Sequence, residues 1–183
     1  MDLKQSRLMP VLPANPKVIG SKPYTGNSDG AAAGPRAGMD EVIRQSIKYA
    51  NGALWNNGSW GVRDMRGKPG SMSVHATGRA WDASNRMSEK HQKANRKNAL
   101  IFINALVANA NALGVEMIID YAVKDFGRAW RCDRQAWQKY DKQTVEHGGS
   151  GDWFHIEHSP AFVNQPLNLI QQAFQRVFTE LPQ

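Results

Sequence analysis

The sequence predicts an α+β domain in which a small, mostly antiparallel sheet is flanked by helices. Residues 39–50, 88–113 and 166–178 carry apolar side chains at helical spacing. Residues 115–121 and 153–158 are rich in β-branched and aromatic side chains, as strands are. The predicted order is helix, strand, a segment bearing His and Asp, long helix, strand, loop, strand and helix, which is typical of the α+β class.

The chain is expected to begin with an arm, residues 1–38, that drapes over the domain or stays mobile. Proline excludes helix and central strand along it, and its prolines are Pro10, Pro13, Pro16, Pro23 and Pro35. The domain is then residues 39–183, with its first helix over 39–50. Gly52 is expected to end this helix.

Turn and strand signals follow in alternation. Asn56-Asn57-Gly58 predicts a turn, 60–66 a short strand and 67–70 a loop. Ser88 is expected to cap the long helix that reaches Leu113. The segment with the strongest strand pattern is 115–121, and 126–131 is predicted as a further strand or a loop wall. Residues 134–140 are predicted as a helical turn and 147–151 as a flexible loop. A strand over 153–158 and an amphipathic helix after Pro166 complete the prediction.

Composition limits the classes of function. The 183 residues fit one domain with extensions, and the net charge of +7 favours polyanionic partners, either nucleic acid or anionic polymers of the bacterial envelope. Cys132 is the only cysteine, so an internal disulfide and a cysteine zinc finger are excluded. Neither a signal peptide nor a membrane span is evident, so we expect synthesis in the cytoplasm without a signal peptide and no membrane insertion.

Two distant segments concentrate the residues that can bind a metal ion. Residues 73–82 (Ser-Val-His-Ala-Thr-Gly-Arg-Ala-Trp-Asp) supply His75 and Asp82, and a bend at Gly78 is needed to bring both to one side. Residues 151–158 (Gly-Asp-Trp-Phe-His-Ile-Glu-His) supply the third ligand. Catalytic zinc commonly takes three such ligands and leaves one position for water.

Strand alternation leaves two candidates for that third ligand. His155 shares one strand face with Glu157, whereas His158 lies on the other. We favour His155 because Asp152, three residues earlier, can then reach a water molecule on the same metal and accept its proton. Glu157 is a candidate for orienting an imidazole from outside the metal.

The spacing Ser73-x-His75-x-x-Gly78-x-Ala80-x-Asp82, followed by Asp152-x-x-His155-x-Glu157, resembles the M15 family of metallopeptidases. This family includes D-Ala-D-Ala carboxypeptidases, L-alanyl-D-glutamate peptidases and many phage endolysins. The Asp at the start of the second motif and the segment 126–130 are similar to the endopeptidase branch. The resemblance covers roughly residues 42–157 and implies a Hedgehog/DD-peptidase-like fold.

Carried over to this chain, the resemblance implies a role for each matching residue. Zinc is expected at His75, Asp82 and His155, with Asp152 as the general base. An arginine that polarises the scissile carbonyl is expected before the first motif, with Arg66 as the first choice and Arg63 as the alternative. Apart from the resemblance, the candidates for substrate contact are Ser73, which bonds either its own loop or the substrate, Trp130, which lines either the core or the cleft, and His147 in the glycine-rich loop.

The expected function is hydrolysis of an amide bond in the stem peptide of peptidoglycan by a bacteriolytic, endolysin-like hydrolase. The bond is L-Ala-D-Glu, D-Ala-D-Ala or a cross-bridge, and the sequence leaves this choice open. We expect a monomer that acts on the bacterial cell wall and does not bind nucleic acid, because the basic residues are scattered and no nucleic-acid motif occurs. The alternative is a catalytically silent module of the same fold that only binds the wall.

Overall fold

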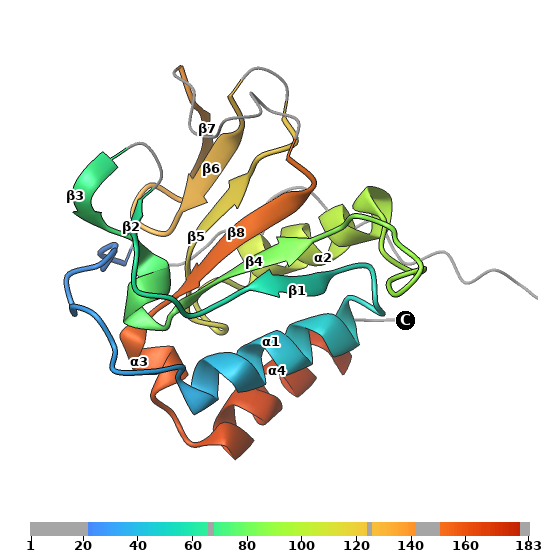
Figure 1. Ribbon diagram of the computed structural model, residues 1–183. Helices are drawn as coiled ribbons and strands as arrows, with labels where there is room; N and C mark the ends of the chain where they lie inside the picture. Colours follow the sequence, from blue (N-terminus) through green and yellow to red (C-terminus); the bar gives the residue numbers. More distant parts are fainter. Residues whose placement is uncertain (1–21, 66–67, 124–125, 142–150, 180–183) are drawn as a thin grey trace, which may run out of the picture.

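The computed structural model describes residues 22–65, 68–123, 126–141 and 151–179 (Figure 1). Its main sheet has six strands in the order β1-β4-β8-β5-β6-β7, and every neighbouring pair is antiparallel. The α+β class with a mostly antiparallel sheet is therefore confirmed. The strands of this sheet are β1 (Trp55–Gly58), β4 (Ala80–Ser84), β5 (Val115–Asp120), β6 (Arg128–Arg131), β7 (Ala136–Lys139) and β8 (Trp153–His158).

Four helices and a small hairpin complete the described part of the chain. The helices are α1 (Ala37–Tyr49), α2 (Arg96–Ala108), α3 (Pro160–Val163) and α4 (Leu167–Thr179). The hairpin pairs β2 (Asp64–Met65) with β3 (Lys68–Met72), and the 3₁₀ turn η1 (Val74–Thr77) follows it directly. Figure 1 shows α1 and α4 packed along one another, with the hairpin and η1 at one end of the sheet.

One face of the sheet is buried by the helices. Alternate residues of the central strands, such as Trp81 in β4 and Phe154 in β8, are 0 % exposed. They share one hydrophobic core with residues of α1, α2 and α4, including Val42, Ile103 and Phe174. Because side chains alternate along a strand, the residues between them point to the opposite face. This opposite face is where the polar residues of the two motifs gather.

Two segments predicted as turns are edge strands. Asn56 pairs with Ala83 of β4, and residues 136–139 pair with β6, so these segments form the two outer edges of the sheet. Their side chains are mostly exposed, which gave them the polar composition of loops. Backbone pairing with an existing sheet outweighs weak local preference, because strand propensity depends on context.

The boundaries of three further elements also differ from the prediction. The long helix begins at Arg96 rather than at Ser88, because Asn95 accepts a hydrogen bond from the Asn98 N–H at 2.9 Å and caps it. Ser88 instead forms an isolated bridge with His91. The strand predicted over 60–66 is reduced to β2, and the segment predicted as the loop 67–70 contributes to β3. The strand 153–158 has the predicted bounds.

The described part of the arm, residues 22–36, lies against the domain without forming helix or strand. The Arg79 guanidinium, which is fully buried, binds the Asp29 carboxylate at 2.9 and 2.7 Å and also contacts the Gly26 carbonyl. The same guanidinium donates to the carbonyl of His158 in the sheet at 2.6 Å. The arm is thus joined to the domain through a bidentate ion pair between a buried guanidinium and a partly exposed carboxylate. None of the helices in the described ranges has the length and apolar character needed to cross a membrane.

His158 predicts a loss of stability in mild acid. Its ring is fully buried on the core face, and burial, together with the nearby Arg79 charge, lowers its pKa to about 4 even though Nδ1 contacts the Leu113 carbonyl. Below pH 6.5 the unfolded chain therefore takes up a proton that the folded chain refuses until about pH 4. This group alone should remove about 3 kcal/mol of unfolding free energy across that interval and have no effect above it.

The measurement is chemical unfolding at several pH values. His158→Asn retains an N–H that can donate to the Leu113 carbonyl, but it cannot titrate. Its unfolding free energy should therefore fall less steeply than that of the wild type between pH 6.5 and 4. Parallel curves for the two proteins would show that His158 is not the group responsible.

Candidate metal centre

The first motif forms a turn that presents His75 to the polar face of the sheet. The Ser73 hydroxyl accepts a hydrogen bond from the His75 N–H at 3.3 Å and begins η1. Gly78 ends the turn with a φ of 71°, a left-handed conformation that glycine adopts without strain. The bend predicted at Gly78 is therefore present, and β4 starts two residues later. This reversal allows His75 and Asp82 to face one another despite their spacing.

The two other residues of the cluster are brought together by strand pairing. Asp82 of β4 lies directly opposite His155 of β8, so the two side chains project from the same face of the sheet. His158 projects from the other face, where its ring packs against Phe162 in the core. Of the two histidines that the sequence left open, the structure places His155 with His75 and Asp82.

The three side chains converge on one point. His75 Nε2 is 3.1 Å from His155 Nδ1 and 3.3 Å from Asp82 Oδ1, and His155 Nδ1 is 3.2 Å from the same oxygen. Zinc bonds of about 2.0–2.1 Å in tetrahedral geometry place neighbouring ligand atoms about 3.3 Å apart. The cluster therefore has the dimensions of one face of a tetrahedral metal site.

The outer nitrogen of each imidazole faces an acceptor. His75 Nδ1 lies against the carbonyl oxygen of Ser59, and His155 Nε2 is 2.9 Å from Glu157 Oε1. Each outer nitrogen must therefore carry the ring proton, which leaves a lone pair on His75 Nε2 and on His155 Nδ1 in the neutral rings. Two lone pairs and a carboxylate oxygen then face one another, an arrangement that needs a cation between them. His75, Asp82 and His155 can thus hold a metal ion.

The shifted pKa values of His155 and Asp82 also indicate that the cluster favours a positive charge. Burial opposes charge on His155, but its hydrogen bonds with Asp82 and Glu157 raise the pKa of the imidazole to about 9. Burial likewise favours the protonated form of Asp82, yet hydrogen bonds and charge from His155 and His75 lower the pKa of this carboxyl well below its usual value. A proton or a metal ion satisfies the cluster, and the two compete for the same atoms.

Asp152 lies at the start of β8 but outside the three-residue cluster. Its backbone carbonyl accepts hydrogen bonds from the Asn85 N–H at 2.9 Å and from the Ser84 hydroxyl at 3.1 Å, which fixes the chain at this point. One carboxylate oxygen, Oδ2, is 3.3 Å from the Arg86 guanidinium. The other, Oδ1, is buried and has no hydrogen-bond partner among the described residues. Within the described ranges, Asp152 therefore has one acceptor atom that no other residue contacts by a hydrogen bond.

Arg63 is the only one of the two candidate arginines that the structure describes. Its guanidinium is 3.7 Å from Asp82 Oδ2 and its side chain is 57 % exposed, so it reaches the cluster from the solvent side. Arg66, the first choice from the sequence, lies outside the described residues.

The three residues expected to contact substrate have different surroundings. Ser73 is buried and bonds to the turn that carries His75, so its hydroxyl supports that turn. Trp130 is 2 % exposed and belongs to the hydrophobic core, so its ring offers no open surface to a substrate. His147 lies outside the described residues.

Two contacts of the cluster have no signal in the sequence. The Ser59 carbonyl that holds His75 is a backbone atom, and a backbone contact imposes no residue type. Tyr24, in the arm, donates a hydrogen bond to Glu157 Oε2 at 2.8 Å. Because Tyr24 is far from both motifs along the chain, the sequence offers no indication of this contact. Glu157 itself was expected to orient an imidazole, and its contact with His155 has that geometry.

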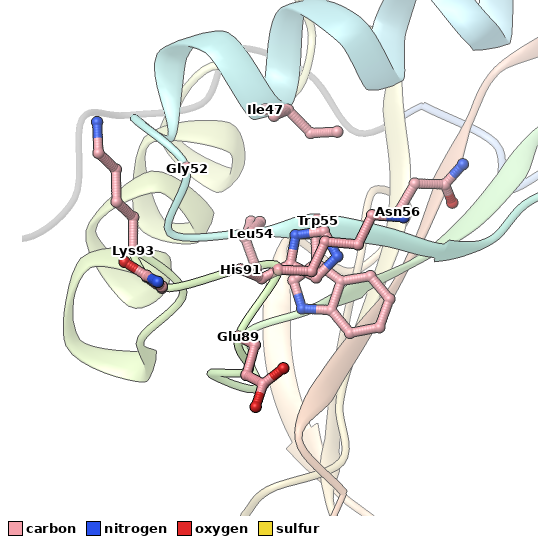
Figure 2. A pocket seen from close by; sticks show the side chains of 10 residues that line it. Ile47, Gly52, Leu54, Trp55, Asn56, Glu89, His91 and Lys93 are labelled. Atoms are coloured by element: carbon pink, nitrogen blue, oxygen red, sulfur yellow. The ribbon is translucent and has the colours of Figure 1, made fainter.

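A surface hollow of about 700 Å³ lies between α1, β1 and the loop after β4. Figure 2 shows Trp55, His91, Leu54 and Ile47 around it. The indole of Trp55 is stacked on His91 at 4.4 Å and also contacts the Arg86 guanidinium. The metal cluster does not line this hollow, so it forms no part of the candidate centre.

Fold and cluster together define an α+β domain with a three-residue candidate metal centre on the polar face of its sheet. The chain matches no protein-family model, no curated protein and no solved structure.

Proposed function

We propose that the chain is a zinc-dependent peptidase that hydrolyses an amide bond in the stem peptide of peptidoglycan. The observation that carries the proposal is the convergence of His75 Nε2, Asp82 Oδ1 and His155 Nδ1 within 3.1–3.3 Å. Three ligands from His and Asp suit a catalytic zinc ion, which keeps one position for water. The motif resemblance to M15 peptidases supports the choice of substrate.

The residues around the cluster have separate tasks in this proposal. When bound, a zinc ion supplies an acidified water molecule and polarises the scissile carbonyl. Asp152 accepts a proton from the attacking water and then delivers it to the nitrogen of the leaving amine. Arg63 donates hydrogen bonds to the carbonyl oxygen as negative charge builds on it.

The direct test is digestion of purified peptidoglycan with the zinc-loaded protein, followed by mass spectrometry of the released fragments. Hydrolysis creates one new amine and one new carboxyl terminus, and their identity names the bond that is cut. A parallel digestion with a chelator should yield no new termini. If the protein binds the wall and yields no new termini even with zinc, the chain is the binding module instead.

Replacement of Glu157 by Gln is expected to weaken zinc binding by about 10–100-fold. The carboxylate accepts a hydrogen bond from His155 Nε2. Its negative charge makes the opposite nitrogen, Nδ1, a stronger electron donor toward the metal. An amide can still form a hydrogen bond but carries no charge. Competition with a colorimetric zinc chelator measures the affinity, and an unchanged affinity would remove Glu157 from the metal centre.

A further inference from the structure

A residue of the arm, Tyr24, contacts the outer side of the metal cluster, although it lies in neither motif. Tyr24 is partly buried, and its hydroxyl donates to Glu157 Oε2 at 2.8 Å. The other oxygen of this carboxylate, Oε1, accepts a hydrogen bond from His155 Nε2 at 2.9 Å. Two successive hydrogen bonds thus connect the arm to an imidazole of the cluster.

This connection fixes the orientation of Glu157. The carboxylate is 1 % exposed, so water cannot replace a missing donor. With Tyr24 on one oxygen and His155 on the other, the carboxylate plane has little freedom to rotate. The His155 ring then keeps its proton on Nε2 and directs Nδ1 toward His75 and Asp82.

The arm also holds the turn that carries His75. The Ala32 N–H donates to the Ala76 carbonyl at 2.8 Å, and the Arg36 side chain donates to the Thr77 carbonyl at 2.7 Å. Both acceptors belong to η1, the turn that carries His75. The arm therefore contacts both elements that supply histidines to the cluster: η1 through these two bonds, and β8 through Glu157.

We propose that Tyr24 is a positioning residue of the metal centre, which holds Glu157 so that Glu157 in turn holds His155 as a ligand. The inference rests on the metal centre proposed above and extends it to a part of the chain that precedes the motifs. It also assigns a role to the described part of the arm: residues 22–36 complete the metal site.

The test is the zinc affinity of Tyr24→Phe, measured by competition with a colorimetric chelator. Phe keeps the ring, which packs against the core and the Arg131 guanidinium at 4.4 Å, so the arm should stay docked. Only the donor to Glu157 is removed. We expect about 10–100-fold weaker zinc binding, as is typical when an outer contact of a ligand is lost.

The matched control is Thr25→Val in the same arm. The Thr25 hydroxyl donates to Glu116 Oε1 at 2.6 Å and not to Glu157. Its loss should lower the melting temperature measured in chelator without changing zinc affinity. Equal losses of affinity in both variants would mean that only docking of the arm matters, and would overturn the assignment of Tyr24.

A double variant tests the route of the effect. If Tyr24 acts through Glu157, adding Tyr24→Phe to Glu157→Gln should cause almost no further loss of zinc affinity. Fully additive losses, or wild-type affinity in Tyr24→Phe, would overturn the inference while leaving the proposed peptidase intact. A wild-type protein that binds zinc tightly but cuts no peptidoglycan would reject the function and leave the role of Tyr24 standing. Absence of zinc binding by the wild type would overturn both.

Discussion

Replacement of Asp152 by Asn is expected to lower the rate of peptide-bond hydrolysis by about 10²–10⁴-fold, the usual contribution of a general base. The amide keeps the size of the side chain, but it cannot accept a proton from water or return one to the leaving amine. Because Asp152 lies outside the three-residue cluster, zinc affinity should not change to a comparable degree. The loss should therefore appear in kcat of fully zinc-loaded protein.

A matched control for this variant is Asp133→Asn. The Asp133 side chain is 35 % exposed, the same fraction as Asp152, and it also pairs with an arginine, Arg131. It lies just beyond β6 and belongs neither to the cluster nor to the proposed catalytic residues, so its replacement should leave hydrolysis intact. Full hydrolytic activity in the Asp152→Asn protein would exclude this residue as the base.

The ligand residues of the candidate centre could be predicted because each depends on a local rule. A glycine with positive φ at Gly78 reverses the chain between His75 and Asp82, and glycine is the residue that permits this. The alternation of side chains along a strand predicts that His155 and His158 lie on opposite faces of the sheet, and they do. Such rules need only the residues of one segment, whereas the pairing of β4 with β8 that brings Asp82 and His155 together lies outside their range.

The other parts of the fold depend on distant partners. Asn56-Asn57-Gly58 has the composition of a turn, and only its pairing with β4 makes it a strand. The helix start at Asn95 rather than Ser88 depends on which of two good capping residues the surrounding packing selects. The contact of Tyr24 with Glu157 joins residues 133 positions apart. The residues of a single sequence carry no signal for pairings of this kind.

Removal of the Asp82 carboxylate is expected to weaken zinc binding strongly. About 10–16 kcal/mol shared by four ligands amounts to roughly 3–4 kcal/mol for each, a loss in affinity on the order of 10²–10³-fold. Asp82→Asn preserves the shape of the side chain and its place opposite His155 in the sheet. Because the carboxylate oxygen is replaced by a neutral group, the two imidazoles then face the metal without an anionic partner.

Thermal unfolding measures this loss without any substrate. Zinc at about 100 times its Kd stabilises the folded wild type by about 2.7 kcal/mol, which raises the Tm of a domain of this size by about 5–10 °C. A chelator should reverse the rise, and the Asp82→Asn protein should show almost none at the same zinc concentration. The control Asp64→Asn changes an exposed carboxylate of β2 that binds the Gly70 N–H, and it should retain the full rise. An equal rise in the Asp82→Asn protein would place the zinc elsewhere, because a site built on His75, Asp82 and His155 cannot lose its anionic ligand without a loss of affinity.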